Sequence, residues 1–116
     1  MNKVLLIGRL TDDVKTKIYG KGKDAGCYAN FTVAVDRGGK DQPADFIRCV
    51  AFNSTAEFLE KYTGKGVRIG IEGSWQTGSY EDKETGKTVY TNDCYVQRVE
   101  FADGRKDDDN DRRGRR

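Results

Sequence analysis

The segment from Asp45 to Phe52, DFIRCVAF, contains the side chains best suited to binding a ligand. In a β-strand, successive side chains point to opposite faces, so this segment has two different faces. One face is small and apolar, as the interior of a barrel requires: Ile47, Cys49 and Ala51. The other face carries Phe46, Arg48, Val50 and Phe52. Two aromatic rings around an arginine suit a nucleic acid, because bases stack on rings while the guanidinium contacts a phosphate or stacks on a base.

Phe46 and Phe52 could instead face a second layer of protein, such as a subunit interface or a helix. Arg48 lies between them, and a dry interface would have to satisfy its five N–H donors, which disfavours this alternative. Each stacked base contributes about 1–3 kcal/mol, so a few rings matter more than the overall charge. We therefore expect this face to bind nucleic acid.

Tyr80 and Trp75 are two further aromatic candidates. The segment from Val67 to about Tyr80 is typical of a strand, and Tyr80 stands at the base of a hairpin whose tip carries two lysines. An aromatic and basic arm suits a clamp over a nucleic-acid strand, although an exposed hairpin tyrosine without a role fits the same pattern. Trp75 shares the phase of Ile69 and Ile71, so it could belong to the core or contact the ligand.

Basic residues are spread along the chain rather than gathered in one run. The segment 11–26, expected to be a loop or a loosely paired ribbon, contains Lys15, Lys17, Lys21 and Lys23. Such a loop is often only solvated, but beside an aromatic face it adds phosphate affinity that falls with salt. Three other basic residues are similar candidates: Lys3, Arg9 and Lys65.

The composition favours a small all-β domain. The chain has 116 residues, of which 35% are hydrophobic and 34% charged, so we expect a modest core in a closed barrel or an oligomer. Fourteen glycines against one proline, with turns between strands, favour β-structure. The net charge of +2 does not by itself indicate a nucleic-acid partner.

The residue types disfavour several classes of site. Three widely separated cysteines form no C-x-x-C pair and there is no histidine, so we expect reduced, packed cysteines and no metal site. No glycine-rich nucleotide loop and no base–nucleophile pair is legible, so we expect neither catalysis nor a cofactor. The apolar run from Val4 to Ile7 is too short for a signal sequence or a membrane span, which predicts an intracellular protein.

The alternation of apolar residues predicts five strands, over residues 3–10, 27–36, 45–52, 67–80 and 88–101. A helix of about two turns is expected after the third strand, with Ser54 and Glu57 at the spacing of a capping box. Its apolar face would contain Thr55, Phe58, Leu59 and Tyr62. This order is that of an OB-fold, a partly open five-stranded barrel. We expect residues 1–102 to form this domain and residues 103–116, which are charged and lack apolar side chains, to be a disordered tail.

Four segments together have the order and spacing of a known family: MNKVLLIGRL, YANFTVAVDR, ADFIRCVAFNSTAEFLEKY and GKGVRIGIEGSWQTGSYEDKETGKTVY. With them, most of residues 1–101 resembles the bacterial and phage single-stranded DNA-binding proteins, the SSB family. The resemblance implies an OB-fold that assembles as a homotetramer. It also implies sequence-independent binding of single-stranded DNA during DNA replication, recombination and repair.

The resemblance implies roles for particular residues. The family's stacking aromatic in the third strand falls on Phe46, and its phenylalanine at the end of that strand falls on Phe52. The aromatic at the base of the long hairpin falls on Tyr80. The arginine after the first aromatic falls on Arg48, and a lysine before the fourth strand falls on Lys65.

The sequence also departs from the family's pattern. A further tryptophan that some members carry after the second strand is replaced here by the segment from Arg37 to Gly39. Basic positions beside the family's Q-T segment are Gln76 and Gly78, and Trp75 stands where a smaller aliphatic residue is common. Lower affinity or a different site size is consistent with these changes.

Cellular members of the family end in an acidic tip that recruits replication and repair proteins. Here the sequence stops at DDDNDRRGRR, which either lies within a linker, as we expect, or belongs to a naturally short form, so such a tip is implied only beyond Arg116. The resemblance implies a bacterial, cytoplasmic and nucleoid-associated protein, and leaves open whether a cell or a phage encodes it. The alternative function is single-stranded RNA binding or service as an accessory OB module of a replication complex. RNA binding stays open because no residue identifies or excludes a contact to a 2′-hydroxyl.

Overall fold

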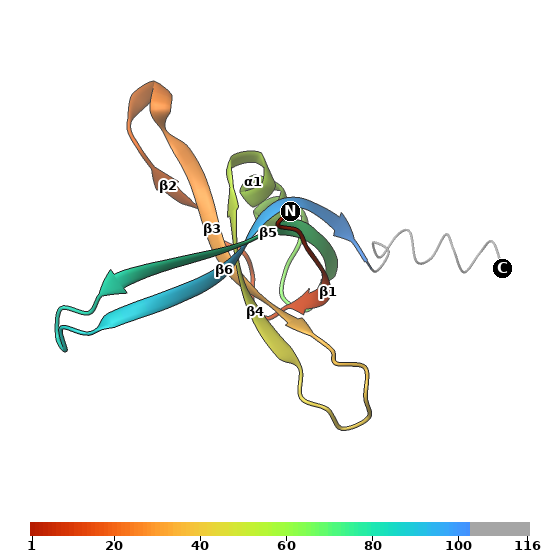
Figure 1. Ribbon diagram of the computed structural model, residues 1–116. Helices are drawn as coiled ribbons and strands as arrows, with labels where there is room; N and C mark the ends of the chain where they lie inside the picture. Colours follow the sequence, from red (N-terminus) through yellow and green to blue (C-terminus); the bar gives the residue numbers. More distant parts are fainter. Residues whose placement is uncertain (103–116) are drawn as a thin grey trace.

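The segments predicted from alternation are β-strands in the computed structural model, which describes residues 1–102 (Figure 1). In chain order the elements are β1 (Val4–Leu10), β2 (Lys17–Tyr19), the short 3-10 helix η1 (Gly22–Asp24), β3 (Gly26–Val35), β4 (Asp45–Phe52), α1 (Asn53–Tyr62), β5 (Arg68–Glu81) and β6 (Thr88–Phe101). Among the described residues, the helices are too short or too polar to cross a membrane. The predicted tail, residues 103–116, lies outside the described residues.

Five of the strands close into a ring in the order β1, β5, β6, β4, β3, and β1 pairs back onto β3 through Arg9–Ala34 and Leu10–Val33. The pairing of β4 with β6 is parallel and the other pairings are antiparallel. This ring, with α1 between β4 and β5, confirms the predicted OB-type barrel. β2 pairs with the start of β3 outside the ring, which makes the segment 11–26 the loosely paired ribbon that was one of its two expected forms.

Three arms extend from the barrel (Figure 1). One is the β2–β3 ribbon, one is the connection from β3 to β4, and the third is the hairpin of β5 and β6. β1 pairs with β5 only as far as Gly73, and β4 pairs with β6 only at Cys94 and Tyr95. Beyond those residues β5 and β6 pair with each other alone, so their outer halves project as a free ribbon.

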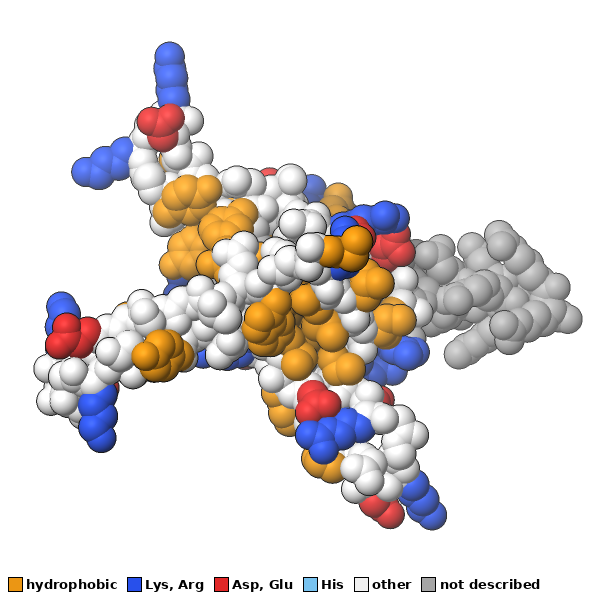
Figure 2. Space-filling model, in the orientation of Figure 1, with side chains coloured by type: hydrophobic (Ala, Val, Ile, Leu, Met, Phe, Trp, Pro, Cys, Tyr) orange, Lys and Arg blue, Asp and Glu red, His pale blue; other side chains and the backbone are white. Residues whose placement is uncertain are grey.

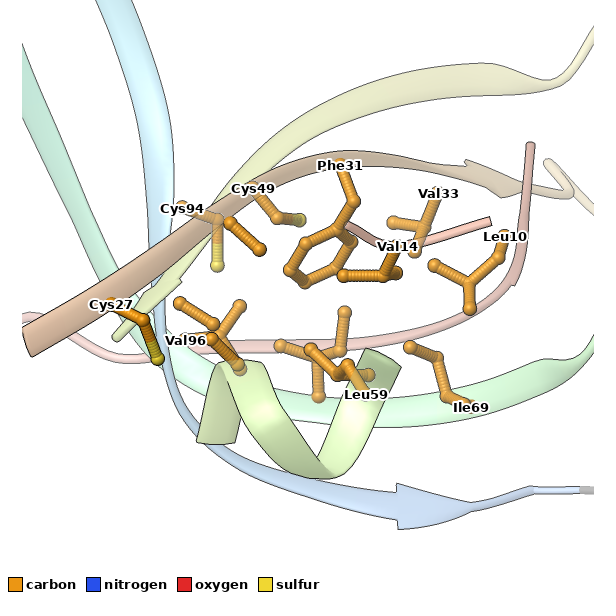
Figure 3. Packing of buried hydrophobic residues seen from close by; sticks show 14 residues of the cluster. Leu10, Val14, Cys27, Phe31, Val33, Cys49, Leu59, Ile69, Cys94 and Val96 are labelled. Carbon is orange, nitrogen blue, oxygen red and sulfur yellow. The ribbon is translucent and has the colours of Figure 1, made fainter. Parts of the chain in front are cut away.

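The core fills the ring with the residues that alternation assigned to the inner face (Figure 3). On β4 these are Cys49 and Ala51, which are buried, and Ile47, which packs against them. Cys27, Cys49 and Cys94 all lie in this core. Burial raises the pKa of the Cys49 and Cys94 thiols, so both stay protonated at neutral pH and pack as small apolar side chains.

The start of α1 differs from the predicted capping box. The N-cap residue is Phe52, which makes no side-chain cap hydrogen bond. Asn53 has a φ of 52°, a conformation that asparagine tolerates better than most residues. Its Oδ1 accepts a hydrogen bond from the Cys27 N–H at 3.1 Å, so the start of the helix is tied to β3 rather than capped within itself.

The buried face of α1 is also rotated from the predicted one. Ala56 and Leu59 are the buried residues of the helix, whereas Tyr62, expected on that face, is exposed. Tyr62 packs its ring on Phe58, with centroids 5.3 Å apart. The helix therefore packs on the barrel through Ala56 and Leu59, and Tyr62 makes its ring contact at the surface.

Gly73 allows β5 and β6 to approach closely where the sheet carries its register shift, between Glu72 and Gly73. A Cβ at Gly73 would lie 2.3 Å from the carbonyl oxygen of Tyr95. The shift leaves β5 in phase, so Ile69, Ile71 and Trp75 keep the same orientation in the sheet.

Candidate nucleic-acid interface

The outer face of β4 presents the residues predicted for it. Phe46 is 67% exposed and Phe52 is 41% exposed, and the side chain of Arg48 is 71% exposed. Val50 lies on the same face but is buried. The alternate residues of β4 are held in the core, so the strand presents two rings and a guanidinium from a fixed backbone.

Neighbouring strands extend this face, because register partners on adjacent strands point to the same side of a sheet. One row across β1, β3 and β4 consists of Arg9, Ala34 and Phe46. A second row pairs Tyr28 of β3 with Phe52. Arg9, predicted from sequence as a phosphate contact, therefore lies on the same side as Phe46, one strand beyond Ala34.

Arg48 has an acidic neighbour on β6. Its Nε lies 3.6 Å from Oδ1 of Asp93, whose side chain is 24% exposed. The two residues meet because the parallel pairing sets Cys49 opposite Cys94, one residue further along each strand. Asp93 thus offsets part of the positive charge on the face.

A second ion pair lies at the Phe46 end of the strand. Arg37 donates to both carboxylate oxygens of Asp45, from Nε at 3.1 Å to each and from Nη2 at 2.8 Å to Oδ1. These hydrogen bonds hold the pKa of Asp45 below its ordinary value, so the carboxylate stays ionised at neutral pH. The pair joins the ends of β3 and β4 directly before Phe46.

Tyr80 is exposed and lies near the tip of the free hairpin rather than at its base, where the sequence predicts it, because β5 and β6 stay paired as far as Glu81 and Thr88. Ser74 is the register partner of Tyr95, which in turn is the partner of Val50, so these three side chains share one side of the sheet. Side chains alternate along β5, and Tyr80 is six residues after Ser74, so Tyr80 lies on that side too. The hairpin therefore carries Tyr80 on the same side of the sheet as the outer face of β4.

Trp75 lies on the opposite side. Its register partner is Cys94, a core residue, but Trp75 stands beyond the end of the core and is 37% exposed. Its backbone exchanges two hydrogen bonds with the Asn2 side chain, and its Nε1 donates to Asn92 Oδ1 at 3.4 Å. Trp75 is thus not brought together with Phe46 and Phe52.

Lys3 and Lys65 lie away from the aromatic rows. Lys3 forms an ion pair with Glu72 at 3.1 Å, near the start of β1. Lys65 lies in the loop before β5, where its N–H donates to Oδ1 of Asp13 at 2.8 Å. The next residue, Gly66, accepts a hydrogen bond from Nη1 of Arg9 at 3.0 Å, so Lys65 is a near neighbour of Arg9.

Three tyrosines beside Phe52 were not predicted as site residues: Tyr19, Tyr28 and Tyr95. Centroid distances to the Phe52 ring are 6.3 Å for Tyr19, 6.4 Å for Tyr28 and 5.8 Å for Tyr95. Alternation places Tyr28 and Tyr95 opposite the buried side chains of their strands, which is a signal for the outer face. Only the register of β3 and β6 against β4 brings them to Phe52, and that register is not legible in one sequence.

Figure 2 shows hydrophobic side chains gathered at the base of the β2–β3 arm, while lysines and arginines occupy the tips of the arms together with acidic residues. This face is therefore hydrophobic near the barrel and mixed in charge at the tips of the arms.

Comparison with known proteins gives a consistent result. Residues 1–102 match the profile of the Single-strand binding protein family. The single-stranded DNA-binding protein of Clostridium perfringens is 43% identical over 103 residues, which cover 89% of this chain and 67% of that protein. Single-stranded DNA-binding protein 2 of Clostridium acetobutylicum is 41% identical over 110 residues, covering 92% and 80%. The single-stranded DNA-binding protein of Fusobacterium nucleatum is 40% identical over 111 residues, covering 90% and 69%.

Proposed function

The chain belongs to the single-strand binding protein family, whose members bind DNA without enzymatic activity. We propose that it binds single-stranded DNA without sequence preference through the outer face of β4. The observation that carries the proposal is the exposure of Phe46 and Phe52 on either side of Arg48. Exposing two aromatic rings on a rigid strand to water does not stabilise the fold, whereas every base has a face that can stack on them. Stacking is tolerant of sequence, which suits a protein that must bind any exposed strand.

The other site residues would act around this centre. Tyr80 stacks a base from the hairpin, which can close over the strand, and Arg48 and Arg9 contact phosphates. Lys65 extends the phosphate track from Arg9, as its position beside Gly66 supports. Lys3 and Trp75 are contacts only for a strand that continues around the barrel, since they lie on other surfaces.

A homotetramer would form through the outer surface of β1 and β5. Leu5 is 72% exposed and Ile7 is 54% exposed, and they line a shallow hollow with Gly70. β1 has register partners on β3 only at Arg9 and Leu10, so the first five residues of β1, Val4 to Gly8, have no partner on β3. An apolar, partly unpaired edge is typical of a surface that pairs with another chain. Residues 1–102 would be the assembling domain.

In the cell, such a protein would coat and protect single strands during DNA replication, recombination and repair. It would act in the bacterial cytoplasm in association with the nucleoid. Recruitment of replication and repair proteins would require an acidic tip beyond Arg116.

The test of binding is titration with oligo-dT while aromatic fluorescence is followed. Stacking should quench the fluorescence, and several dozen nucleotides should saturate a tetramer, since one OB domain takes about 4–16 nucleotides. Absence of binding at low salt would remove the proposal. Equal competition by oligo-U would instead favour an RNA-binding function.

The assembly has its own test. Sedimentation should give a tetramer for the unaltered chain and smaller species for Leu5→Glu, because a buried, unpaired charge is costly. Ile18→Glu is the matched control, since Ile18 is also exposed but lies on β2. A tetramer that survives Leu5→Glu would assign the interface to another surface.

A further inference from the structure

Beside Phe52, the outer face has a shallow, open pocket of about 360 Å³ lined by Tyr19, Tyr28, Asn30, Val50, Phe52 and Tyr95. We propose that this pocket holds one nucleobase of the bound strand, lifted out of the stack, with its edge hydrogen-bonded to the Asn30 amide. The inference rests on the proposed function, and it names a site that differs from flat stacking on Phe46.

The walls of the pocket are aromatic. The centroids of Tyr19, Tyr28 and Phe52 form a nearly equilateral triangle, with separations of 6.2, 6.3 and 6.4 Å. Tyr95 stands 5.8 Å from Phe52 and extends the wall toward β6. Rings tilted at such separations support one another, and together they line an apolar surface that suits a planar guest.

Tyr19 is held in this wall by a glycine. Gly26 is its register partner on β3, and a Cβ there would lie 2.6 Å from the Tyr19 hydroxyl oxygen and 2.7 Å from Cζ. The ring therefore lies directly against the backbone of the neighbouring strand. β2 has only three residues and, among the described strands, pairs with β3 alone. The absence of a side chain at Gly26 therefore allows the Tyr19 ring to lie beside the pocket.

The floor combines an apolar and a polar group. Asn30, Val50 and Tyr95 form one row across β3, β4 and β6. Val50 is buried, whereas Asn30 is exposed and lines the pocket, so its side chain is accessible to a ligand there. An amide carries both a donor and an acceptor, and each of the four bases presents donors or acceptors on its edge, so Asn30 can pair with any of them.

A nucleobase suits this pocket better than other planar apolar ligands, for two reasons. Phe52 belongs both to the pocket and to the proposed DNA-binding face, so a strand stacked along β4 arrives at the opening. Lys17 is the register partner of Tyr28 and shares its side of the ribbon, which places a cation where the phosphate of the inserted nucleotide would lie.

The experiment compares two probes: an oligo-dT short enough for one barrel, about 4–16 nucleotides, and a deoxyribose-phosphate oligomer of equal length without bases. In Tyr28→Ala and Tyr95→Ala, affinity for oligo-dT should fall by about 5- to 150-fold, while affinity for the abasic oligomer changes less than about twofold. Tyr28→Phe should retain the oligo-dT affinity, because it keeps the ring. Asn30→Ala should lower the affinities for dT, dA, dC and dG oligomers alike, because its amide can pair with any of the four bases.

A direct readout separates binding from a merely structural role. In the unaltered chain, the NMR ring signals of Tyr28 and Tyr95 should shift with oligo-dT and stay unchanged with the abasic oligomer. Tyr62→Ala on α1 is the matched control and should leave both affinities unchanged, since Tyr62 is an exposed tyrosine packed on Phe58. Normal oligo-dT binding with unmoved Tyr28 and Tyr95 signals would overturn the pocket and leave the proposed function standing; failure to bind either oligomer would overturn the proposed function.

Discussion

At the scale of single residues, the alternation of side chains along β4 places small residues in the core and aromatic residues on the outer face. Cys49 and Ala51 are small because the barrel interior has little room, and their burial fixes the strand. Phe46 and Phe52 then point outward, because successive side chains of a strand point to opposite faces of the sheet. The core does not require a large aromatic residue at such a position, which is the basis for proposing that these rings bind a ligand.

Phe46→Ala should weaken binding of oligo-dT by about 1–3 kcal/mol, because the most exposed ring of the face is lost as a stacking surface. Lys87→Ala, on the hairpin tip, should weaken it less, since one surface charge contributes little at physiological salt. Fluorescence titration of both variants measures the difference. Equal losses would mean that charge, rather than stacking, dominates the affinity.

Asp93→Asn should strengthen binding, by up to about fivefold, because the substitution leaves the exposed Arg48 free of a competing carboxylate. Glu84→Gln at the hairpin tip is the control for net charge alone and should have a smaller effect. Titration with oligo-dT at low salt compares the two. Weaker binding in Asp93→Asn would show instead that Asp93 serves mainly to hold Arg48 in position.

At the scale of elements, the bounds of a strand can be predicted from the sequence where its own residues and flanking turns determine them. The predicted bounds of β4 and the last strand agree with the structure, because alternation and flanking turns define them locally. The cap of α1 was predicted wrongly, because Asn53 is held by the Cys27 N–H of β3, a contact between distant segments. Tyr28 and Tyr95 were missed for the same reason: their partner Phe52 is set by register, and register depends on three strands at once.

Gly73→Ala should lower the free energy of unfolding by about 1–3 kcal/mol, because the new methyl group meets the Tyr95 backbone and the Cys94 sulfur. Gly70→Ala is the matched control on the same strand, since its Cβ would find its nearest neighbour at 3.9 Å. That variant should be neutral or slightly stabilising. Because Gly70 borders the proposed tetramer surface, the two variants are compared once sedimentation shows that both assemble as the unaltered chain does. Urea denaturation of both measures the effect, and equal stabilities would mean that β5 and β6 move apart at little cost.

At the scale of the whole molecule, the nearly balanced charge limits how the protein can hold DNA. The net charge is +2, and the basic residues at the tips of the arms have acidic neighbours. Two of the candidate cations, Lys3 and Arg48, already face carboxylates. Under the proposed function, affinity would therefore come largely from rings, with few phosphates neutralised per barrel.

This balance predicts a shallow dependence of affinity on salt. For single strands, the slope of log affinity against log salt is about −0.7 per phosphate neutralised. Arg48→Gln should make the slope shallower by about 0.7, because one phosphate contact is lost. Phe46→Ala should lower the affinity at every salt concentration without changing the slope, since stacking releases no counterions. Titrations of a short oligo-dT over a range of salt measure both quantities in the same series, and a slope that changes in Phe46→Ala but not in Arg48→Gln would reverse the assignment of stacking and phosphate contact on this face.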